Sequence, residues 1–455
     1  YPLRHLAGCC GIPVGMPWPL GAGTVSLLGL PTEEDWILHG PYTDKTLMRN
    51  VLIMQMARET GQYASRTRHV ELLLNGEYRG VYVLMEKIKR DGDRVDIAKL
   101  DSSDIAGDDL TGGYIFQINN NSADGWNSNY DVVTSPGDKL QFSYVYPKHS
   151  VILPVQEQYI QAYVDSFEQA LIAPSYMNTA GKRYDEYIDL ESFAEHFILS
   201  EVGKNVDAYR LSSYVWKKKD SKGGKLHAGP MWDFNLAFFN ADYCDAWESF
   251  GWMYDEHCDD YNPFWWGRLR ADPVFMNVVY CRWNDMRATV LDTANLYGII
   301  DSVVTHLGDA ADRNFEQWPV LGTYLWPNPA TPATYAGEIQ NLKDWLADRL
   351  AWLDANITGS CMVSVDDGVA VEHVELTVWP NPGREAVRLD VSSGWAGRAQ
   401  LRVVDLRGQI VLQEEIGVEA GRMSLPLEVE ALAPGVYAIV LEGGFGRKTV
   451  KWVKI

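Results

Sequence analysis

The chain of 455 residues exceeds the length at which a single hydrophobic core stops growing, so we expect two or more domains. Hydrophobic residues make up 46% of it and charged residues 22%, as in globular proteins. The formal net charge of −21 argues against direct nucleic-acid binding, and no apolar run of about 18 residues predicts a transmembrane helix.

The first predicted elements follow an irregular start. Residues 1–25 are rich in Gly and Pro and keep neither helical nor strand periodicity. Residues 45–60 predict a helix that ends at Gly61. Two apolar runs joined at Asn75-Gly76 predict a β-hairpin, because this dipeptide readily adopts the backbone of a tight turn.

Helices and strands alternate through the middle of the chain. Residues 112–118 and 141–146 predict strands, and residues 153–172 and 190–204 predict helices. A second hairpin is expected over residues 211–229. Further on, residues 335–356 predict an amphipathic helix. This mixture of elements predicts an α+β domain.

Six cysteines are scattered along the chain, and none belongs to the paired CxxC motifs of a structural zinc site. Cys244 and Cys258 bracket a polar, aromatic loop, which favours a disulfide formed in an oxidising compartment. The alternative is that both are unrelated free thiols.

Two acidic residues flank the second hairpin at positions that suit phosphoryl transfer. This chemistry needs one carboxylate that orients the attacking hydroxyl and a second that holds Mg²⁺ against the phosphates. Asp207 lies where the first is expected, and Asp233 lies where the metal-binding carboxylate is expected. Ser212, five positions after Asp207, stands where an Asn would be a stronger metal ligand.

Five motifs follow one another along the chain: TDKTLMRNVLIMQMARETG, VELLLNGEYRGVYVLMEKIKRDGDRVDI, GGYIFQI, NVDAY and WDFNLAF. They resemble the CotH kinase family, and we predict such a domain over residues 26–358. The resemblance implies an atypical protein-kinase-like fold that uses ATP and Mg²⁺ or Mn²⁺ to phosphorylate proteins. It implies that Asp233 binds metal and that Asp207 lies at the phosphoryl-acceptor site. The alternatives are a turn residue at Asp233 and a surface or helix-capping residue at Asp207.

The same resemblance implies a nucleotide-binding role for Glu86, Arg49 and Asn50. Glu86 could instead be a solvated charge at a strand end, and Arg49 could form an internal salt bridge. Asn235 stands where many family members have a second metal-binding Asp, so the expected metal ligands are Asp233, Ser212 and Asn235.

Departures from the family pattern support a rival hypothesis, a surface structural or binding protein that keeps the kinase-like scaffold without catalysis. The family's N-terminal strands and phosphate-binding Lys should precede LLGLPTEEDWIL, but residues 1–25 resemble neither, so we expect an incomplete N-terminal part. Ser212 and Asn235 point the same way. The Trp-rich loop Trp247–Trp266 prompts a third hypothesis, a carbohydrate-active protein, although no carboxylate pair stands out as a glycosidase dyad.

The end of the chain changes character. Residues 359–374 predict a linker, and residues 375–455 alternate short apolar runs with Gly, Pro and Asn, which predicts a small all-β sandwich. The module resembles the type IX secretion C-terminal sorting domain of Bacteroidetes-type bacteria through Pro380-Asn381-Pro382, Asp405, Gly408, Pro434-Gly435-Val436-Tyr437, Lys451 and Lys454. The resemblance implies contact with the type IX machinery and a secreted or outer-membrane surface location. A generic β-sandwich binding domain is the alternative.

Overall fold

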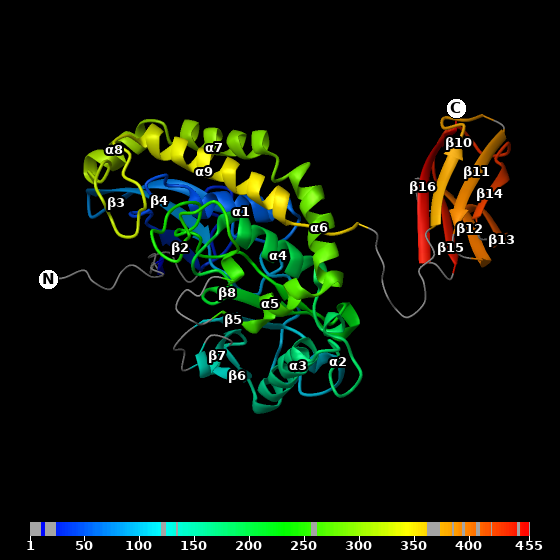
Figure 1. The fold of residues 1–455 in the computed structure, drawn as a ribbon, viewed down its shortest axis with the longest axis horizontal. Helices are drawn as coiled ribbons and strands as arrows, with labels where there is room; N and C mark the ends of the chain where they lie inside the picture. The colour runs from blue at the N-terminus through cyan, green and yellow to red at the C-terminus, as the bar shows by residue number, and fades with distance from the viewer. Residues whose placement is uncertain are drawn as a thin grey trace. The chain divides into compact units, whose positions relative to one another are not determined.

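The computed structural model describes residues 11–13, 24–119, 124–132, 135–255, 262–361, 374–384, 386–393, 396–405, 410–419, 421–443 and 446–454. The chain divides into two compact units, Tyr1–Cys361 and Met362–Ile455 (Figure 1). The first unit is a mixed α and β domain, and the second consists of β-strands, as the sequence predicts. Most of the irregular segment 1–25 lies outside the described residues.

The first sheet of the larger unit contains the predicted Asn-Gly hairpin. Its strands follow the order β1 (Gly11–Pro13), β2 (Trp36–His39), β4 (Glu77–Glu86) and β3 (Thr67–Leu74), and neighbouring strands are antiparallel. Asn75 and Gly76 connect β3 to β4 with positive φ angles of 53° and 83°. The left-handed backbone expected at this dipeptide is therefore confirmed.

Helix α1 (Arg49–Glu59) begins four residues later than the sequence predicts. The Asp44 carboxylate accepts hydrogen bonds from the backbone N–H groups of Thr46 (3.1 Å) and Arg49 (2.8 Å), and Leu47 has a φ of 63°. This acidic side chain therefore closes a turn before the helix starts.

The second sheet contains the other predicted hairpin. The order of its strands is β6 (Gly125–Val132), β7 (Ser135–Tyr146), β5 (Tyr114–Ile118), β8 (Ser213–Lys217) and β9 (Leu226–Ala228). The strands β8 and β9 are shorter than expected because a 3-10 turn, Asp220–Lys222, lies between them. The short helix α2 (Gly107–Leu110) precedes β5, while α3 (Pro154–Ile172) and α4 (Leu190–Gly203) confirm the predicted helices.

Five more helices complete the larger unit. They are α5 (Phe264–Ala271), α6 (Pro273–Arg287), α7 (Thr293–Leu307), α8 (Asp309–Gln317) and α9 (Tyr335–Asn356). Helix α9 matches the predicted amphipathic helix, and its apolar face buries Leu342, Leu346 and Leu353. Two tryptophans of these helices, Trp265 and Trp283, are nearly inaccessible in the core and donate to Glu168 (2.9 Å) and Asp354 (3.1 Å).

A disulfide joins Cys281 of α6 to Cys361 at the end of the first unit, with the two Cα atoms 5.1 Å apart. This pairing was not predicted from the sequence. Cys244 is also disulfide-bonded, but Cys258 lies outside the described residues, so their pairing remains a prediction.

The second unit confirms the predicted all-β architecture. One sheet has the order β10 (Val374–Trp379), β11 (Ala386–Ser393) and β14 (Gly421–Glu428), and the other has the order β13 (Ile410–Val418), β12 (Gly397–Asp405), β15 (Gly435–Gly443) and β16 (Gly446–Lys454). Leu389 from one sheet and Leu401, Ile439 and Trp452 from the other share a buried apolar cluster, so the sheets form a sandwich.

The Pro-Asn-Pro turn holds the final strand of this sandwich. Asn381 donates from Nδ2 to the Lys451 carbonyl (2.7 Å) and accepts from the Val453 N–H (3.0 Å). The buried Lys454 ammonium donates to the carbonyls of Val429 (2.6 Å) and Glu430 (2.8 Å). Asn381 and Lys454, singled out in the sequence, therefore have direct structural roles.

Candidate functional site

The candidate site is built on the end of helix α4. Asp189 caps the start of this helix by accepting from the Ser192 N–H, and Lys204 ends it with a left-handed φ of 42°. The buried Lys204 ammonium donates to the carbonyls of Asp245 (2.7 Å) and Phe250 (2.6 Å). One side chain therefore fixes a long loop against the end of the helix.

Gly203 lets the segment after Asp233 approach this helix end. The Phe238 N–H donates to the Gly203 carbonyl at 2.7 Å. A Cβ atom at position 203 would lie 3.1 Å from the Phe234 ring and 3.4 Å from the Ala237 methyl group. A larger residue would press on the segment that follows the predicted metal ligand.

Asn205 joins the two acidic loops and is 2% exposed. Its Oδ1 accepts from the Asp207 N–H (3.3 Å), and its Nδ2 donates to the Asp233 carbonyl (3.2 Å). The Ser212 hydroxyl donates to Oδ2 of Asp233 over 3.4 Å. These contacts bring Asp207, Ser212 and Asp233 into one neighbourhood.

Two of these residues hold an unusual backbone conformation. Asp233 and Ser212 have φ angles of 65° and 50°, in the left-handed region that non-glycine residues seldom occupy. Such residues persist where surrounding contacts hold them, and they concentrate at functional sites.

Asp207 contacts a neighbouring cation. Its Oδ1 lies 3.1 Å from a terminal guanidinium nitrogen of Arg210, whose Nε donates to the Val206 carbonyl (3.0 Å). Asn205 therefore orients the backbone of Asp207, and Arg210 places a positive charge beside its carboxylate.

Arg49 and Asn50 contact the segment that carries Asp233. Asn50 Oδ1 accepts from the Phe234 N–H at 2.6 Å. The Arg49 guanidinium donates to the carbonyls of Ala237 (3.1 Å) and Phe238 (3.2 Å) and pairs with Asp44 at 2.5 Å. Both predicted nucleotide-binding side chains are buried and brace this loop, and the internal salt bridge considered for Arg49 is present.

His39 lies beside this brace, 3.2 Å from Nδ2 of Asn50. Burial lowers the pKa of the His39 imidazole, although the charges of Asp44 and Asp233 act to raise it. A neutral ring is therefore favoured here, and it can accept a hydrogen bond from the Asn50 amide.

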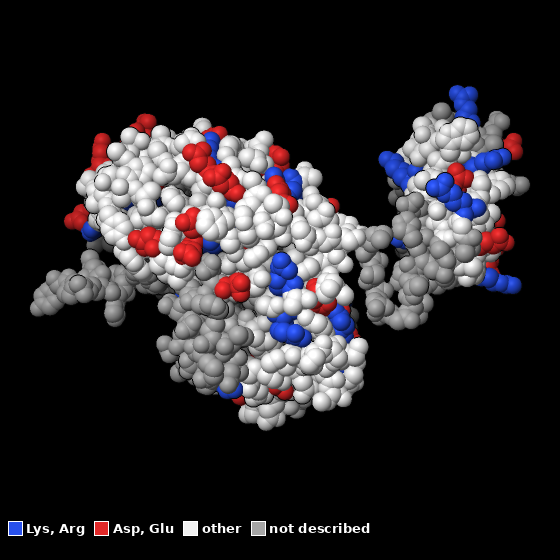
Figure 2. All heavy atoms as spheres, in the orientation of Figure 1, with Lys and Arg blue, Asp and Glu red and all other residues white. Residues whose placement is uncertain are grey.

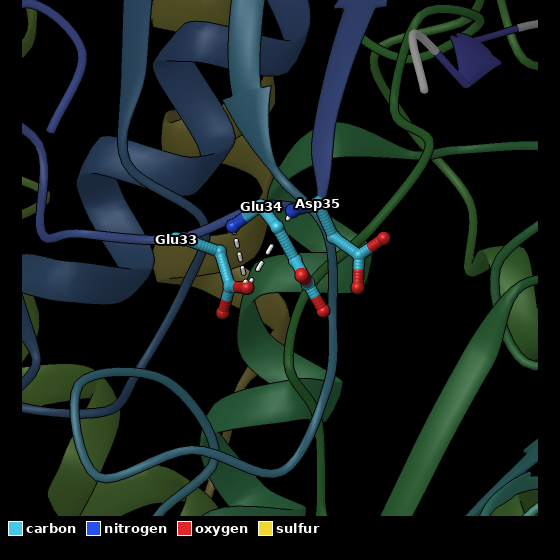
Figure 3. A group of neighbouring side chains, drawn as sticks. All are labelled: Glu33, Glu34 and Asp35. Carbon is cyan, nitrogen blue, oxygen red and sulfur yellow. Dashed lines mark hydrogen bonds between the residues drawn. The ribbon is translucent and has the colours of Figure 1, made fainter. Parts of the chain in front are cut away.

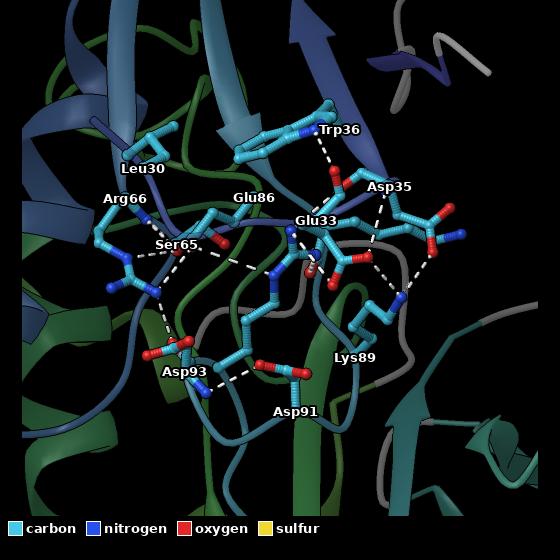
Figure 4. A network of polar contacts seen from close by, with 12 residues as sticks. Leu30, Glu33, Asp35, Trp36, Ser65, Arg66, Glu86, Lys89, Asp91 and Asp93 are labelled. Atoms are coloured by element: carbon cyan, nitrogen blue, oxygen red, sulfur yellow. Dashed lines mark hydrogen bonds and ion pairs between the residues drawn. The ribbon is translucent and has the colours of Figure 1, made fainter. Parts of the chain in front are cut away.

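Glu86, the third predicted nucleotide-binding residue, is fully buried at the end of β4 (Figure 4). Its carboxylate lies 2.7 Å from an Arg66 guanidinium nitrogen and 3.9 Å from Nε of Arg94. It also accepts a hydrogen bond from the Arg66 N–H at 2.9 Å. Glu86 is thus an enclosed carboxylate between two cations and not a solvated charge.

Glu33, Glu34 and Asp35 form an acidic group whose ligand atoms lie within 4.8 Å of one another (Figure 3). The Lys89 ammonium lies 2.9 Å from both Glu33 and Asp35. Burial acts to raise the pKa of Glu33, but hydrogen bonds from Glu34 and Lys89 and the Arg94 charge outweigh it and lower the pKa. Two of the three carboxylates are thus already paired with side-chain cations, Glu33 with Lys89 and Arg94 and Asp35 with Lys89, so this group is a weak candidate for a metal ion.

Asn235, the remaining predicted metal ligand, is half-buried two residues after Asp233. Its carbonyl accepts from Nδ2 of Asn240 (2.7 Å), which anchors its backbone. Asp233, Ser212 and Asn235 offer a carboxylate, a hydroxyl and an amide oxygen, a hard-oxygen set that suits Mg²⁺ or Mn²⁺.

Sequence reasoning missed the polar side chains that hold these loops, Asn205, Lys204, Glu201 and Arg349. Glu201 and Arg349 form a fully buried ion pair at 3.0 Å, and Glu201 accepts from the backbone N–H groups of Met253 (2.8 Å) and Tyr254 (3.0 Å). The apolar periodicity of α4 and α9 could not indicate an ion pair between two residues that lie 148 positions apart in the sequence. Asn205, adjacent to the NVDAY motif, could have been weighed as a loop brace.

Comparisons with known proteins address both units. The family described as CotH kinase protein matches residues 21–353, and the secretion system C-terminal sorting domain matches residues 377–455. No curated protein matches the chain significantly. In the part of the chain that the structure describes, no helix has the length and apolar character needed to cross a membrane.

Two solved structures show slight similarity. Dimeric latent PorU from Porphyromonas gingivalis is 17% identical, covers 20% of this chain and 10% of its own, and has a TM-score of 0.18. A β-glucosidase from Listeria innocua in complex with glucose is 15% identical, covers 19% and 16%, and has a TM-score of 0.14. Neither carries an argument about this protein.

The two family matches agree with the architecture of the two units. The sorting domain marks the protein for secretion to the cell surface or beyond it. The match over residues 21–353 spans most of the chain and the whole of the braced acidic site. The chain belongs to the CotH kinase protein family and carries a C-terminal secretion sorting domain.

Proposed function

We propose that the larger unit transfers the terminal phosphoryl group of ATP to a hydroxyl of a protein, with Mg²⁺ or Mn²⁺ as the metal. The observation that carries this proposal is the Asn205 bridge, which links the backbones of Asp207 and Asp233. Phosphoryl transfer depends on positioning and charge stabilisation, so a hydrogen-bonded link between the backbones of the acceptor-side and metal-side residues supports it.

In this proposal Asp233 is the principal metal ligand, assisted by Ser212 and Asn235. The bound metal would neutralise phosphate charge during transfer. The Asn50 contact to the Phe234 N–H and the Arg49 contacts to two carbonyls keep the loop that carries Asp233 in place. Arg49 and Asn50 would then act on the nucleotide through this loop.

Asp207 would orient the acceptor hydroxyl and take its proton. The Asn205 contact fixes its backbone, and Arg210 holds the carboxylate from one side. Glu86, enclosed by Arg66 and Arg94 at the end of β4, would keep this edge of the nucleotide site rigid.

The proposal is tested by γ-phosphate transfer from ATP to a generic protein acceptor such as casein, with Mg²⁺ or Mn²⁺ present. Asp207→Asn and Asp233→Asn should each reduce transfer by at least about a hundredfold, because each removes a charge needed in the transition state. Asp312→Asn, which alters an exposed carboxylate of α8, is the matched control and should keep full activity.

The rival function is a surface binding protein without catalysis, favoured by Ser212 and Asn235 in place of stronger metal ligands. Metal-dependent γ-phosphate transfer by the wild-type protein, lost in Asp233→Asn, would argue against this rival. Phosphotransfer that persists unchanged in Asp233→Asn would instead show that our assignment of the site is wrong.

We also propose that residues 375–455 serve as a detachable export address that contacts the type IX machinery. Its support is the separate apolar core of the second unit, which lets it fold independently. Deleting this unit should trap the protein in the periplasm of a type IX-competent host and leave ATP binding unchanged. Surface display of the truncated protein would contradict the role.

A further inference from the structure

A cavity of about 290 Å³ lies between strand β6 and helix α3, on elements that carry none of the acidic residues of the kinase-like site. Figure 1 shows α3 next to β6. Its walls combine one indole, several side-chain amides and two carboxylates: Trp126, Asn127, Gln158, Gln161, Asp165 and Glu168. This composition differs from that of an apolar core defect.

The inner wall of the cavity is closely packed and hydrogen-bonded. Trp126 is half-buried, and its ring centroid lies 4.9 Å from those of Phe142 and Tyr144. Glu168 is 1% exposed and accepts hydrogen bonds from Nε1 of Trp265 (2.9 Å) and the Ser128 hydroxyl (2.8 Å). An aromatic surface and a carboxyl group are thus held in fixed positions.

The rim consists of amide groups. Asn127 and Gln158 are exposed, and neither side chain hydrogen-bonds to another residue of the described part of the chain. Gln161 donates to the Tyr144 hydroxyl at 2.8 Å, and Asp165 accepts from Nδ2 of Asn129 at 2.6 Å. Each amide can both donate and accept, so the rim offers both kinds of group to a ligand.

We propose that this cavity binds a neutral sugar residue of a glycan. The apolar C–H face of a pyranose packs on an aromatic side chain such as Trp126, while its hydroxyl groups, which both donate and accept, match Asn127, Gln158 and the carboxylates. The inference is independent of the proposed phosphotransfer, because the two sites share no residue.

Charge favours a neutral ligand over an ionic one. Asp165 repels an anion, which argues against phosphorylated or carboxylated ligands. Burial raises the pKa of Glu168 to about 7, so this carboxyl is partly protonated near neutral pH and attracts a cation weakly. A protein delivered to the cell surface or beyond also meets polysaccharides in its working environment.

The full-length protein is tested against an array of neutral glycans, namely glucose, galactose, mannose and N-acetylglucosamine with their oligomers of three to six units. Isothermal titration with the strongest array ligand follows. We expect binding to at least one neutral glycan, and Asn127→Ala combined with Gln158→Ala should weaken it by at least about tenfold through lost hydrogen bonds.

The matched control is Gln340→Ala, which removes an exposed amide from α9 and should leave glycan binding unchanged. Asn127 and Gln158 are exposed, so the double variant should fold, and an unchanged melting temperature checks this. The inference is overturned if no neutral glycan binds or if the double variant binds as tightly as the wild type. Binding of the cation spermidine in place of every glycan would also overturn it, because it would show that the cavity prefers a charged ligand.

Discussion

The two units stabilise their folds by different means. In the larger unit, buried ion pairs such as Arg49–Asp44 and Arg349–Glu201 hold irregular loops, and several of these loops carry the candidate site. In the smaller unit, strands pack through an apolar cluster, and Lys454 is a buried cation that bonds to backbone carbonyls.

The two units also differ in net charge. Residues 374–455 carry equal numbers of acidic and basic side chains, so the whole net charge of −21 lies before residue 374. On the face that Figure 2 shows, acidic side chains are spread over the larger unit. A sandwich with regular strands satisfies its backbone by pairing, whereas loops that must present functional groups need polar side chains to satisfy and fix them.

Among the variants that test this contrast between the units, Arg349→Met should have the largest effect on the free energy of unfolding. Removing one partner of a buried ion pair leaves the Glu201 carboxylate uncompensated and should lower the free energy of unfolding by about 3–5 kcal/mol. Hydrogen exchange with mass spectrometry, which reports each unit separately, should show the loss in the larger unit alone. Arg398→Ala, in an exposed pair of the sandwich, is the control, and equal losses in both variants would refute the contrast.

Glu168→Gln tests a buried carboxyl of the larger unit through pH. The pKa of Glu168 is about 7 in the folded protein against 4.5 for the free side chain, so folding takes up a proton between these values. The contribution of Glu168 to the free energy of unfolding is complete below pH 4.5, and it falls by roughly 3 kcal/mol as the pH rises through 7. Chemical denaturation at pH 4.5, 6 and 8 should show a weaker pH dependence in the variant, and identical profiles would contradict the raised pKa.

Lys454→Met tests the polar contact of the sandwich and has the smallest expected effect. The change leaves the Val429 and Glu430 carbonyls without their donor and should cost about 1–3 kcal/mol in the smaller unit only. Lys451→Met, at an exposed position of the same strand, should have no measurable effect on melting of the isolated sandwich. If the two variants have the same melting temperature, the buried Lys454 ammonium does not stabilise this end of the sandwich.

Local patterns predicted most of the regular structure. The Asn75-Gly76 turn, the helices α3, α4 and α9, and the all-β second unit follow from periodicity and turn chemistry. The helices α5 to α8 were not predicted. In α5, three consecutive buried aromatic residues, Phe264, Trp265 and Trp266, obscure the helical period.

The candidate site was only partly accessible from sequence. The motifs located Asp207 and Asp233, but the contacts that join them depend on Asn205, and the Asp233 loop depends on Asn50, 184 positions from Phe234. Such pairings are set by the tertiary fold and leave no local periodicity. The roles of Glu86, Arg49 and Asn50 toward a nucleotide remain predictions.

The Cys281–Cys361 disulfide determines where a pulling force enters the larger unit. Tension applied through residues beyond Cys361 passes across the sulfur bridge to α6, so the segment after α9 carries little of it. In an oxidising compartment the unit must then yield as a whole, through its core. Under reducing conditions the same tension would pull residues 357–361 away from the unit before its core unfolds. The disulfide therefore determines whether the unit responds to force by local extension of its end or by unfolding as a whole.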